Sequence, residues 1–357
     1  MIKIEELNKN DIINQTNIPP AKLKSLLNNP FGNDMNCIAL EAINDEVMSV
    51  NMGSVITVPL QLVADGRIYS VCGGSSLSVN PQYRGKGIAA QLTTRRIQLS
   101  RDKIAIASGL SGMSLPLFQK LKFTTFVFPR LIFLRHSRPV LEMFMEGVVL
   151  KICSSLVDAI LSFYSSCLKS FSLFGKENII IEEISEATTG IEEFVKADEH
   201  MFRENHTKEW FNWVLKYPFT EDSHAKQHLY IIKKNGSDVA FFMTKERFYE
   251  QASHRGFKNI ILGSIIEWGV KKGCGLEEKD VCIAALFSFG KNVDAVEVCT
   301  ENKTIIKVLK RRGIIQVGES NFAIKASEDS EFVMFKDEYS NIMNWRIRPA
   351  MSDNGLS

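Results

Sequence analysis

The strongest constraint on how this chain folds is a glycine-containing stretch at residues 78–92, SVNPQYRGKGIAAQL, between a β-rich run and a helix-like run. Gly85 and Gly87 permit backbone conformations and a close approach that side chains would block. A helix beginning at Ile88 would direct its free N–H groups into the same space, where they and the helix dipole favour an anion. Arg84 and Lys86 add positive charge at the rim. The stretch therefore predicts a phosphate-binding loop, with a ligand-free turn as the alternative.

The spacing excludes two other nucleotide-binding loops. The chain has no GxxxxGK[ST], so a P-loop is excluded, and Ala90 stands where a GxGxxG fingerprint needs its third glycine. The segments before the loop, at 37–45, 47–63 and 67–79, favour consecutive antiparallel strands. A dinucleotide site would instead need a βαβ start.

The longer pattern around the loop resembles the acyl-CoA loop of the GNAT superfamily of N-acetyltransferases. Gln82, Gly85 and Gly87 match the family's Q/R-x-x-G-x-G/A signature, and residues 79–92 match it over their whole length. Residues 111–123, SGMSLPLFQKLKF, resemble the motif that follows it in the family. The resemblance covers residues 1–136 well and the region from about 179 only in outline. It implies an α+β fold, with a mixed, mainly antiparallel sheet flanked by helices in two tandem units.

The resemblance also implies a site for an acyl-CoA co-substrate, with acetyl-CoA as the first expectation. The backbone N–H groups from Arg84 through Gly85, Lys86, Gly87 and Ile88 to Ala89 would hold the pyrophosphate. The strand edge at Leu77, Ser78 and Val79 would bind the pantetheine arm, and Ser114 would lie near the CoA. No His/Cys cluster has metal-ligand spacing, so we expect no metal.

The catalytic acid and base are not assigned by this pattern. Many family members carry an acidic tyrosine where this chain has Phe118, and residues 67–79 contain no Glu or Asp to act as a base. The polar candidates on that strand are Cys72, Ser76 and the neighbouring Ser75, and His206 is a candidate from the second half.

The order of predicted elements in residues 1–136 is β-α-β-β-β-loop-α-β-α-β, which we expect to close one unit near residue 136. In the second half we expect strands at 179–184, 228–236, 238–249, 259–270 and 293–300, and helices at 190–202, 207–219, 277–292 and 302–313. Residues 322–326 and 331–340 are expected to be strands or edges. The predicted domains are therefore a catalytic unit at 1–136, a helical linker at 137–178 and a GNAT-like unit at 179–357.

The second unit lacks the glycine signature. Residues 271–280, KKGCGLEEKD, place acidic side chains where a phosphate would lie, so we expect this unit to bind no CoA and to contribute to the acceptor site. Trp210, Trp213, Trp345 and Arg346 are candidate acceptor contacts, because aromatic rings suit a sugar face and arginine suits a phosphate. The alternative is that they are core and tail residues. The layout resembles two-unit GNAT proteins of bacterial surface polysaccharide synthesis.

Composition sets the remaining limits. With Lys+Arg 43 and Asp+Glu 41, the net charge of +2 gives no electrostatic case for nucleic acid. Seven widely spaced cysteines and a charged start favour reduced thiols in a cytoplasmic protein. Residues 141–174 are apolar but are interrupted by Glu146, Lys151 and Asp158, which favours a linker helix or a peripheral membrane helix over a spanning one.

The function expected from these observations is acyl-CoA-dependent N-acylation of a small-molecule amine, by direct attack of the amine on the thioester. An amino sugar or a nucleotide-sugar is one candidate acceptor. The alternatives are acetylation of a peptide or protein amine, or non-catalytic acyl-CoA binding, which Phe118 and the missing carboxylates motivate.

Overall fold

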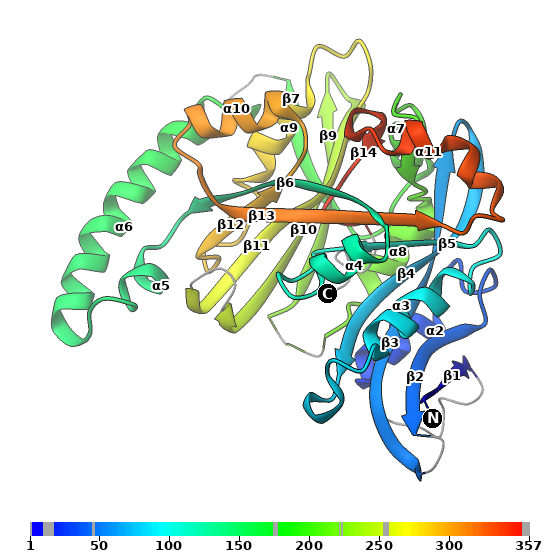
Figure 1. Ribbon diagram of the computed structural model, residues 1–357. Helices are drawn as coiled ribbons and strands as arrows, with labels where there is room; N and C mark the ends of the chain where they lie inside the picture. Colours follow the sequence, from blue (N-terminus) through cyan, green and yellow to red (C-terminus); the bar gives the residue numbers. More distant parts are fainter. Residues whose placement is uncertain are drawn as a thin grey trace.

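A computed structural model describes residues 2–9, 18–44, 47–173, 178–220, 222, 224–252 and 257–351. The described strands form one mixed sheet, in the order β1-β2-β3-β4-β5-β13-β6-β12-β11-β10-β9-β7, with β8 and β14 beside it (Figure 1). The sheet confirms the expected α+β class, because most neighbouring strands are antiparallel and helices flank them.

The first half has the expected order of elements. Its members are β1 (Ile2–Asn8), α2 (Pro20–Leu27), β2 (Cys37–Asn44), β3 (Val47–Ala64), β4 (Arg67–Val79), the short 3₁₀ helix η1 (Pro81–Tyr83), α3 (Ile88–Ile97), β5 (Ile104–Ser108), α4 (Leu115–Lys120) and β6 (Thr124–Leu134). Two helices connect the halves, the short α5 (Arg138–Leu141) and the 24-residue α6 (Gly147–Ser170).

The second half repeats this plan. Its members are β7 (Ile179–Ile184), α7 (Thr189–Lys196), β8 (Phe202–Glu204), α8 (Lys208–Lys216), β9 (Lys226–Lys234), β10 (Ser237–Ala252), β11 (Phe257–Val270), α9 (Glu278–Ala285), β12 (Ala295–Cys299), α10 (Lys303–Arg311), β13 (Ile315–Ala326), η3 (Glu331–Phe335), α11 (Lys336–Tyr339), η4 (Ile342–Asn344) and β14 (Trp345–Arg346). The expectation of strand at 331–340 is wrong. Phe332, Phe335 and Tyr339 are buried at helical spacing, and this burial decides the local structure.

The two halves exchange their last strands. The expected closure near residue 136 would place β6 in the first half alone, but β13 pairs with β5 and lies between β5 and β6. β6 in turn pairs antiparallel with β12 of the second half. Figure 1 shows β13 and β6 crossing the middle of the molecule together. The exchange makes one continuous sheet, and one apolar cluster contains both Leu60 of β3 and Phe241 of β10.

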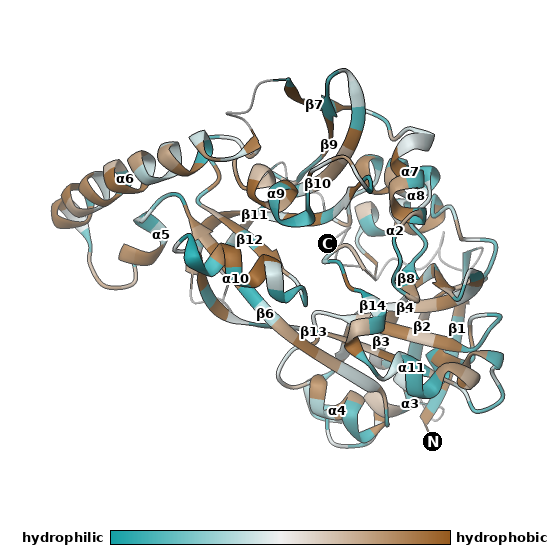
Figure 2. Ribbon diagram, turned by 90° about the horizontal axis from the view of Figure 1, so that it is seen from above, coloured by the Kyte–Doolittle hydropathy of each residue, from teal (hydrophilic) through white to brown (hydrophobic). Residues whose placement is uncertain are grey.

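The helix α6 lies away from the body of the protein (Figure 2). Val149, Ile152, Leu156, Ile160 and Phe163 are exposed along it at spacings of three and four residues. By its length and composition alone, this helix could cross a membrane, because an 18-residue window of it has a mean hydropathy of 1.6. A single helix of this kind is weak evidence for a membrane span. Peripheral membrane contact through residues 141–174 stays a prediction, and Phe174 lies outside the described residues.

Candidate active site

The glycine loop follows β4 directly and leads into α3. Gly85 and Gly87 have φ of 81° and 78°, in the left-handed region, and a Cβ on either would meet open space. Gly87 is the N-cap of α3 and supplies no side-chain cap, so the first N–H groups of the helix are not covered by a capping side chain. Arg84 and Lys86 are exposed beside them. The loop therefore presents a positively polarised, open surface suited to a phosphate.

Next to this loop, β4 and β5 separate from one another. Within the described residues these parallel strands pair only at Val71–Ile104 and Cys72–Ala105, although β4 continues to Val79. The register between β3 and β4 also shifts beside Ser54, and Ser76 in the shifted part of β4 has φ of 54°. This bulge leaves backbone groups of β4 without a strand partner on the β5 side.

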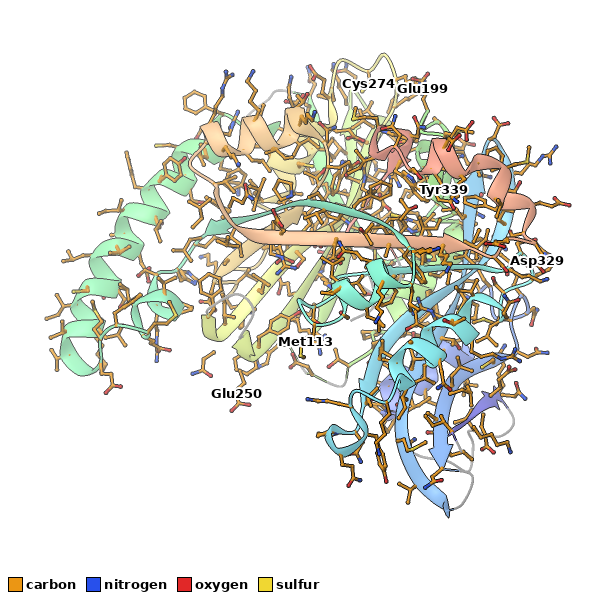
Figure 3. All side chains as sticks on the ribbon, in the orientation of Figure 1. Met113, Glu199, Glu250, Cys274, Asp329 and Tyr339 are labelled. Carbon is orange, nitrogen blue, oxygen red and sulfur yellow. The ribbon has the colours of Figure 1, made fainter. Side chains whose placement is uncertain are left out.

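The space between the separated strands is a cavity of about 200 Å³, which we call the groove. Its lining combines β4, α3, β5 and the start of α4, and consists of Gly74, Ser75, Ser76, Leu77, Arg96, Ala107, Ser108, Gly109, Leu110, Ser111, Ser114 and Phe118. Leu77 and Ser114, expected to lie beside the CoA, are thus brought together on it. Met113 is 83% exposed in the segment before α4 and points into solvent (Figure 3).

Arg96 occupies the end of the groove where the strands begin to separate. It is buried, and its Nη2 donates to the Ile106 carbonyl at 3.2 Å. The guanidinium carbon lies 5.7 Å from the centre of the Phe118 ring, so the phenyl group that replaces the expected tyrosine packs against this cation. A Cβ on Gly74 would overlap with Nη1 of Arg96, so glycine is needed there.

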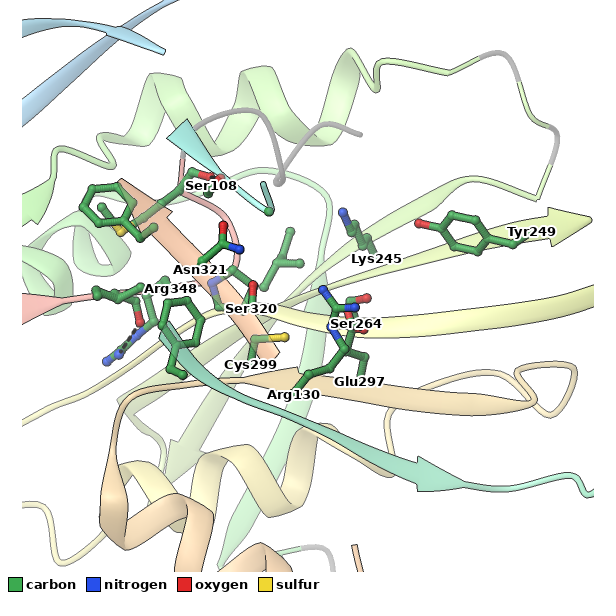
Figure 4. Close-up of a pocket in the computed structure, with 17 residues that line it drawn as sticks. Ser108, Arg130, Lys245, Tyr249, Ser264, Glu297, Cys299, Ser320, Asn321 and Arg348 are labelled. Atoms are coloured by element: carbon green, nitrogen blue, oxygen red, sulfur yellow. Dashed lines mark hydrogen bonds and ion pairs between the residues drawn. The ribbon is translucent and has the colours of Figure 1, made fainter. Parts of the chain in front are cut away.

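A second cavity of about 210 Å³, which we call the chamber, meets the groove at Ser108 and Gly109. It lies between the halves and is lined by β5, β6, β10, β11, β12, β13 and the segment after β14: Ser108, Gly109, Phe128, Arg130, Lys245, Tyr249, Ser264, Ile266, Glu297, Cys299, Ser320, Asn321, Phe322, Ile347, Arg348, Pro349 and Met351. Ser108 lies at one side of it and Tyr249 at the other, with Cys299 between them (Figure 4).

The side of the chamber away from Ser108 carries charge. Arg130 Nε lies 3.2 Å from Glu297 Oε2, and both side chains are largely buried. Among the described residues that line the chamber, Glu297 is the one that carries a carboxylate. The Lys245 side chain lines the chamber as well. A ligand in the chamber would therefore meet hydrogen-bonding and charged groups at one end and the groove at the other.

The three catalytic candidates lie in different surroundings. Ser76 accepts a hydrogen bond of 2.8 Å from Lys22 Nζ and lines the groove. Cys72 is fully buried, and burial raises the pKa of its thiol to about 12 although the charge of Arg96 opposes this rise. His206 is buried and lines neither cavity, and its ring stacks 3.7 Å from the Trp210 ring.

A buried ion cluster surrounds His206. Its Nδ1 lies 2.5 Å from Glu267 Oε2, and Arg346 Nη2 lies 2.5 Å from Glu267 Oε1. Burial lowers the pKa of His206, but the Glu267 and Glu204 carboxylates outweigh this and raise it. Burial would raise the pKa of Glu267, yet Arg346 and His206 hold it at about 2. These groups stabilise each other's charged forms in the core.

The four residues expected to contact the acceptor belong to this core. Trp210, Trp213, Trp345 and Arg346 are each at most 3% exposed, and none lines the groove or the chamber. Trp213 Nε1 donates to the Ser25 carbonyl and Trp345 Nε1 donates to the Tyr339 carbonyl. Trp213, Trp345 and Arg346 thus use polar atoms within the protein, as buried structural residues do.

The second half differs from the first at the corresponding place, where a cavity of about 400 Å³ lies between the end of β11 and the starts of α9 and α10. β11 and β12 pair from Leu262–Ala295 to Ile265–Val298, and beyond them the segment after β14 fills the space. Ala350 N donates to the Ile266 carbonyl, and the Arg348 guanidinium lies 4.2 Å from the centre of the Trp268 ring. At the start of α9, the Glu277 and Asp280 side chains form a capping box. Carboxylates thus cover the N–H groups that a phosphate would need.

Comparisons with known proteins agree with this arrangement at the level of the fold. No protein-family model matches the chain, and no curated protein matches it. The fold is that of the GNAT superfamily. Saccharomyces cerevisiae N-myristoyltransferase with bound myristoyl-CoA has a TM-score of 0.55 at 10% identity, over 90% of this chain and 78% of that one. A GCN5-related N-acetyltransferase from Anabaena variabilis has a TM-score of 0.55 at 10% identity, over 91% and 73%. Another from Kribbella flavida has a TM-score of 0.50 at 10% identity, over 91% and 71%.

Among the described residues, no group of three or more His, Cys, Asp or Glu side chains could hold a metal ion. All seven cysteines are free, and four of them are buried. The groove and the chamber, next to the strand that leads into the polarised loop, together form the candidate site.

Proposed function

We propose that this protein is an acyl-CoA-dependent N-acyltransferase whose acceptor is a small polar amine. The observation that carries the proposal is the junction of the groove with the chamber at Ser108 and Gly109. β4, which lines the groove, leads directly into the glycine loop, and no residue of that loop lines the chamber. Two substrates bound in these cavities would meet with their reactive ends at the junction.

The chain's own residues support direct transfer. The loop from Arg84 to Ala89 would hold the pyrophosphate, and the free edge of β4 from Leu77 to Val79 would bind the pantetheine arm. A backbone N–H at the β4 bulge would polarise the thioester carbonyl as charge develops on its oxygen. The Arg130–Glu297 pair would orient the acceptor from the far side of the chamber.

A short acyl group, with acetyl as the first candidate, fits the groove best. Its lining contains five serines and the buried guanidinium of Arg96. A long alkyl chain beside this guanidinium would separate the cation from polar partners at a large cost in free energy. The neighbour that binds myristoyl-CoA shares the fold at 10% identity and gives no evidence on the acyl group here.

The acceptor is proposed to be a small molecule because the chamber lies between the halves and measures only about 210 Å³. An amino sugar or nucleotide-sugar remains one candidate, although the tryptophans that suggested a sugar lie in the core. The chamber suits any small acceptor that carries polar groups besides its amine, because its lining offers serines, Asn321, Arg130, Lys245 and Glu297.

The test is thiol release from acetyl-CoA and from longer acyl-CoAs over a panel of amino sugars, nucleotide-sugars, amino acids, polyamines and peptides. Release with acetyl-CoA and a small amine, together with mass-spectrometric detection of the amide, is expected. Transfer only to peptides would contradict the small-molecule acceptor. Tight CoA binding in calorimetry with no transfer to any amine would favour a non-catalytic acyl-CoA-binding protein.

A further inference from the structure

Arg96 is held at the closed end of the groove by residues of three elements. It projects from α3, donates from Nη2 to the Ile106 carbonyl of β5, and packs on Phe118 of α4. Opposite it, β4 carries Gly74, where any Cβ would overlap with the guanidinium. Ile106 and Gly74 both lie just beyond the last paired residues of β4 and β5. A cation is therefore fixed at the point where the strands part.

We propose that Arg96 stabilises the CoA thiolate that departs during acyl transfer, and this inference rests on the proposed function. The amine nitrogen forms a bond to the thioester carbon, and the carbon–sulfur bond then breaks with its electron pair passing to sulfur. The amine loses one proton to solvent and the thiolate later takes one up, so atoms and charge balance. Arg96 pairs with the sulfur anion throughout this step.

An arginine suits this task without acting as an acid. A guanidinium remains charged at every pH in which the protein is folded, so it supplies charge and N–H donors and gives up no proton. The negative charge on sulfur develops as the carbon–sulfur bond breaks, so the interaction is stronger in the transition state than with the bound thioester. Phe118 has no hydroxyl, and its ring instead supports the cation that replaces that function.

The neighbouring charges favour the same conclusion. No carboxylate is present among the described residues that line the groove. Lys22 reaches the Ser75 and Ser76 hydroxyls and adds a second cation near β4. The field of Arg96 already acts on one sulfur atom of β4, since it opposes the rise that burial causes in the pKa of Cys72.

The test titrates the thiol of bound CoA and needs no acceptor. The thiolate absorbance of the full-length protein with CoA is measured against pH, and the same measurement with desulfo-CoA is subtracted to remove the protein's own cysteines. In the wild type we expect the pKa of the bound thiol to be lower than in free CoA by about 1 to 2 units. Arg96→Met should remove this shift. Arg95→Met is the matched control, because Arg95 directly precedes Arg96 on α3 and pairs with Glu6 at the surface.

A second variant keeps the charge and moves it. Gly74→Ala inserts a methyl group where the guanidinium lies, so the end of the Arg96 side chain must shift. Gly74→Ala should reduce the pKa shift of the bound thiol although the arginine is still present. If Arg96→Met does not fold, this variant tests the role of Arg96 in its place. In turnover, both variants should lose roughly 10²-fold in kcat with acetyl-CoA. They should lose much less with an acetyl thioester of a more acidic thiol.

The outcomes are distinct. A bound thiol that titrates as in free CoA in the wild type overturns the role of Arg96, even if acyl transfer is observed. An equal shift in the wild type, Arg96→Met and Gly74→Ala does the same. Failure of CoA to bind at all would overturn the proposed function, and this inference with it.

Discussion

The hydroxyl of Ser108 donates a hydrogen bond of 2.9 Å to the carbonyl of Met351. Ser108 ends β5 in the first half, whereas Met351 lies in the segment after β14, so the contact joins residues 243 positions apart. Both residues line the chamber, and Ser108 lines the groove as well. The last described segment of the chain is therefore part of the wall at the junction where we expect the acyl group to pass to the acceptor.

The first prediction concerns the far end of the chamber. Glu297→Gln should raise the KM for the acceptor by about tenfold or more, because a charged hydrogen-bonding group is worth roughly 1.5–3 kcal/mol. The KM for acyl-CoA should stay nearly constant, since Glu297 does not line the groove. Glu319→Gln is the control, because Glu319 lies exposed on β13, which β6 separates from the strand of Glu297. Steady-state kinetics check this, and equal changes in the two KM values would contradict it.

The second prediction concerns the glycine loop. Gly87→Trp should abolish measurable CoA binding in calorimetry, because the indole would occupy the space in front of the α3 N–H groups and the left-handed backbone disfavours it. Gly66→Trp is a matched control. Gly66 has φ of 77° and open space around it, but it lies in the turn at the opposite end of β4. Similar melting temperatures with a loss of binding only in Gly87→Trp are expected, and unchanged affinity would refute the loop assignment.

The sequence alone predicts the part of this site that local patterns determine. The signature at Gln82, Gly85 and Gly87 identifies the loop, and alternation identifies nearly all the strands. Arg96 could have been noticed, because it follows Ile88 and Leu92 at intervals of four residues and so falls on the buried face of α3. An arginine on an apolar helix face is unusual, and its burial calls for a partner.

The chamber could not be predicted because it depends on pairing between distant segments. Nothing local in residues 124–134 or 315–326 indicates that β6 and β13 exchange places, yet this exchange brings Arg130 next to Glu297. The burial of the tryptophans could not be predicted for a related reason. Aromatic residues on an amphipathic helix serve a core or a binding surface equally well, and Trp210 lies under His206 in the core.

The third prediction is a stoichiometry of one CoA per chain. The α9 terminus in the second half is capped by Glu277 and Asp280, whose negative charge would repel a pyrophosphate. The segment from Trp345 to Met351 also occupies the space beside β11. Calorimetric titration with CoA should therefore give a ratio close to one, and a ratio of two would show that the second half also binds CoA.

The fourth prediction tests membrane contact by α6. If its exposed apolar face binds lipid, the protein should sediment with phospholipid vesicles. Leu156→Glu should weaken this sedimentation, because it would place a charge on the face that enters the lipid. Ser155→Glu adds the same charge one residue away on the exposed surface of the helix. Equal sedimentation of the two variants, or none by the wild type, would contradict peripheral binding.

The fifth prediction concerns the buried ion cluster and its dependence on pH. The pKa of Glu267 is about 2 in the folded protein and 4.5 in its ordinary state, so its contribution to stability is present above about pH 4.5 and is lost as the pH falls toward 2. The pKa of His206 is raised, so its contribution is present below its ordinary value of 6.5 and is lost as the pH rises through the raised value. The cluster should therefore stabilise the fold most in mildly acidic solution.

Glu267→Gln tests this directly. It leaves His206 and Arg346 buried beside a neutral side chain, which should lower the free energy of unfolding by about 3 kcal/mol or more near neutral pH. The variant should also lose much of the fall in stability between pH 4.5 and 2, because the group that takes up the proton is gone. Urea unfolding at several pH values measures both effects. Glu199→Gln, which removes an exposed partner of Lys272, should change neither, and a Glu267→Gln profile parallel to the wild type would show that the acid sensitivity arises elsewhere.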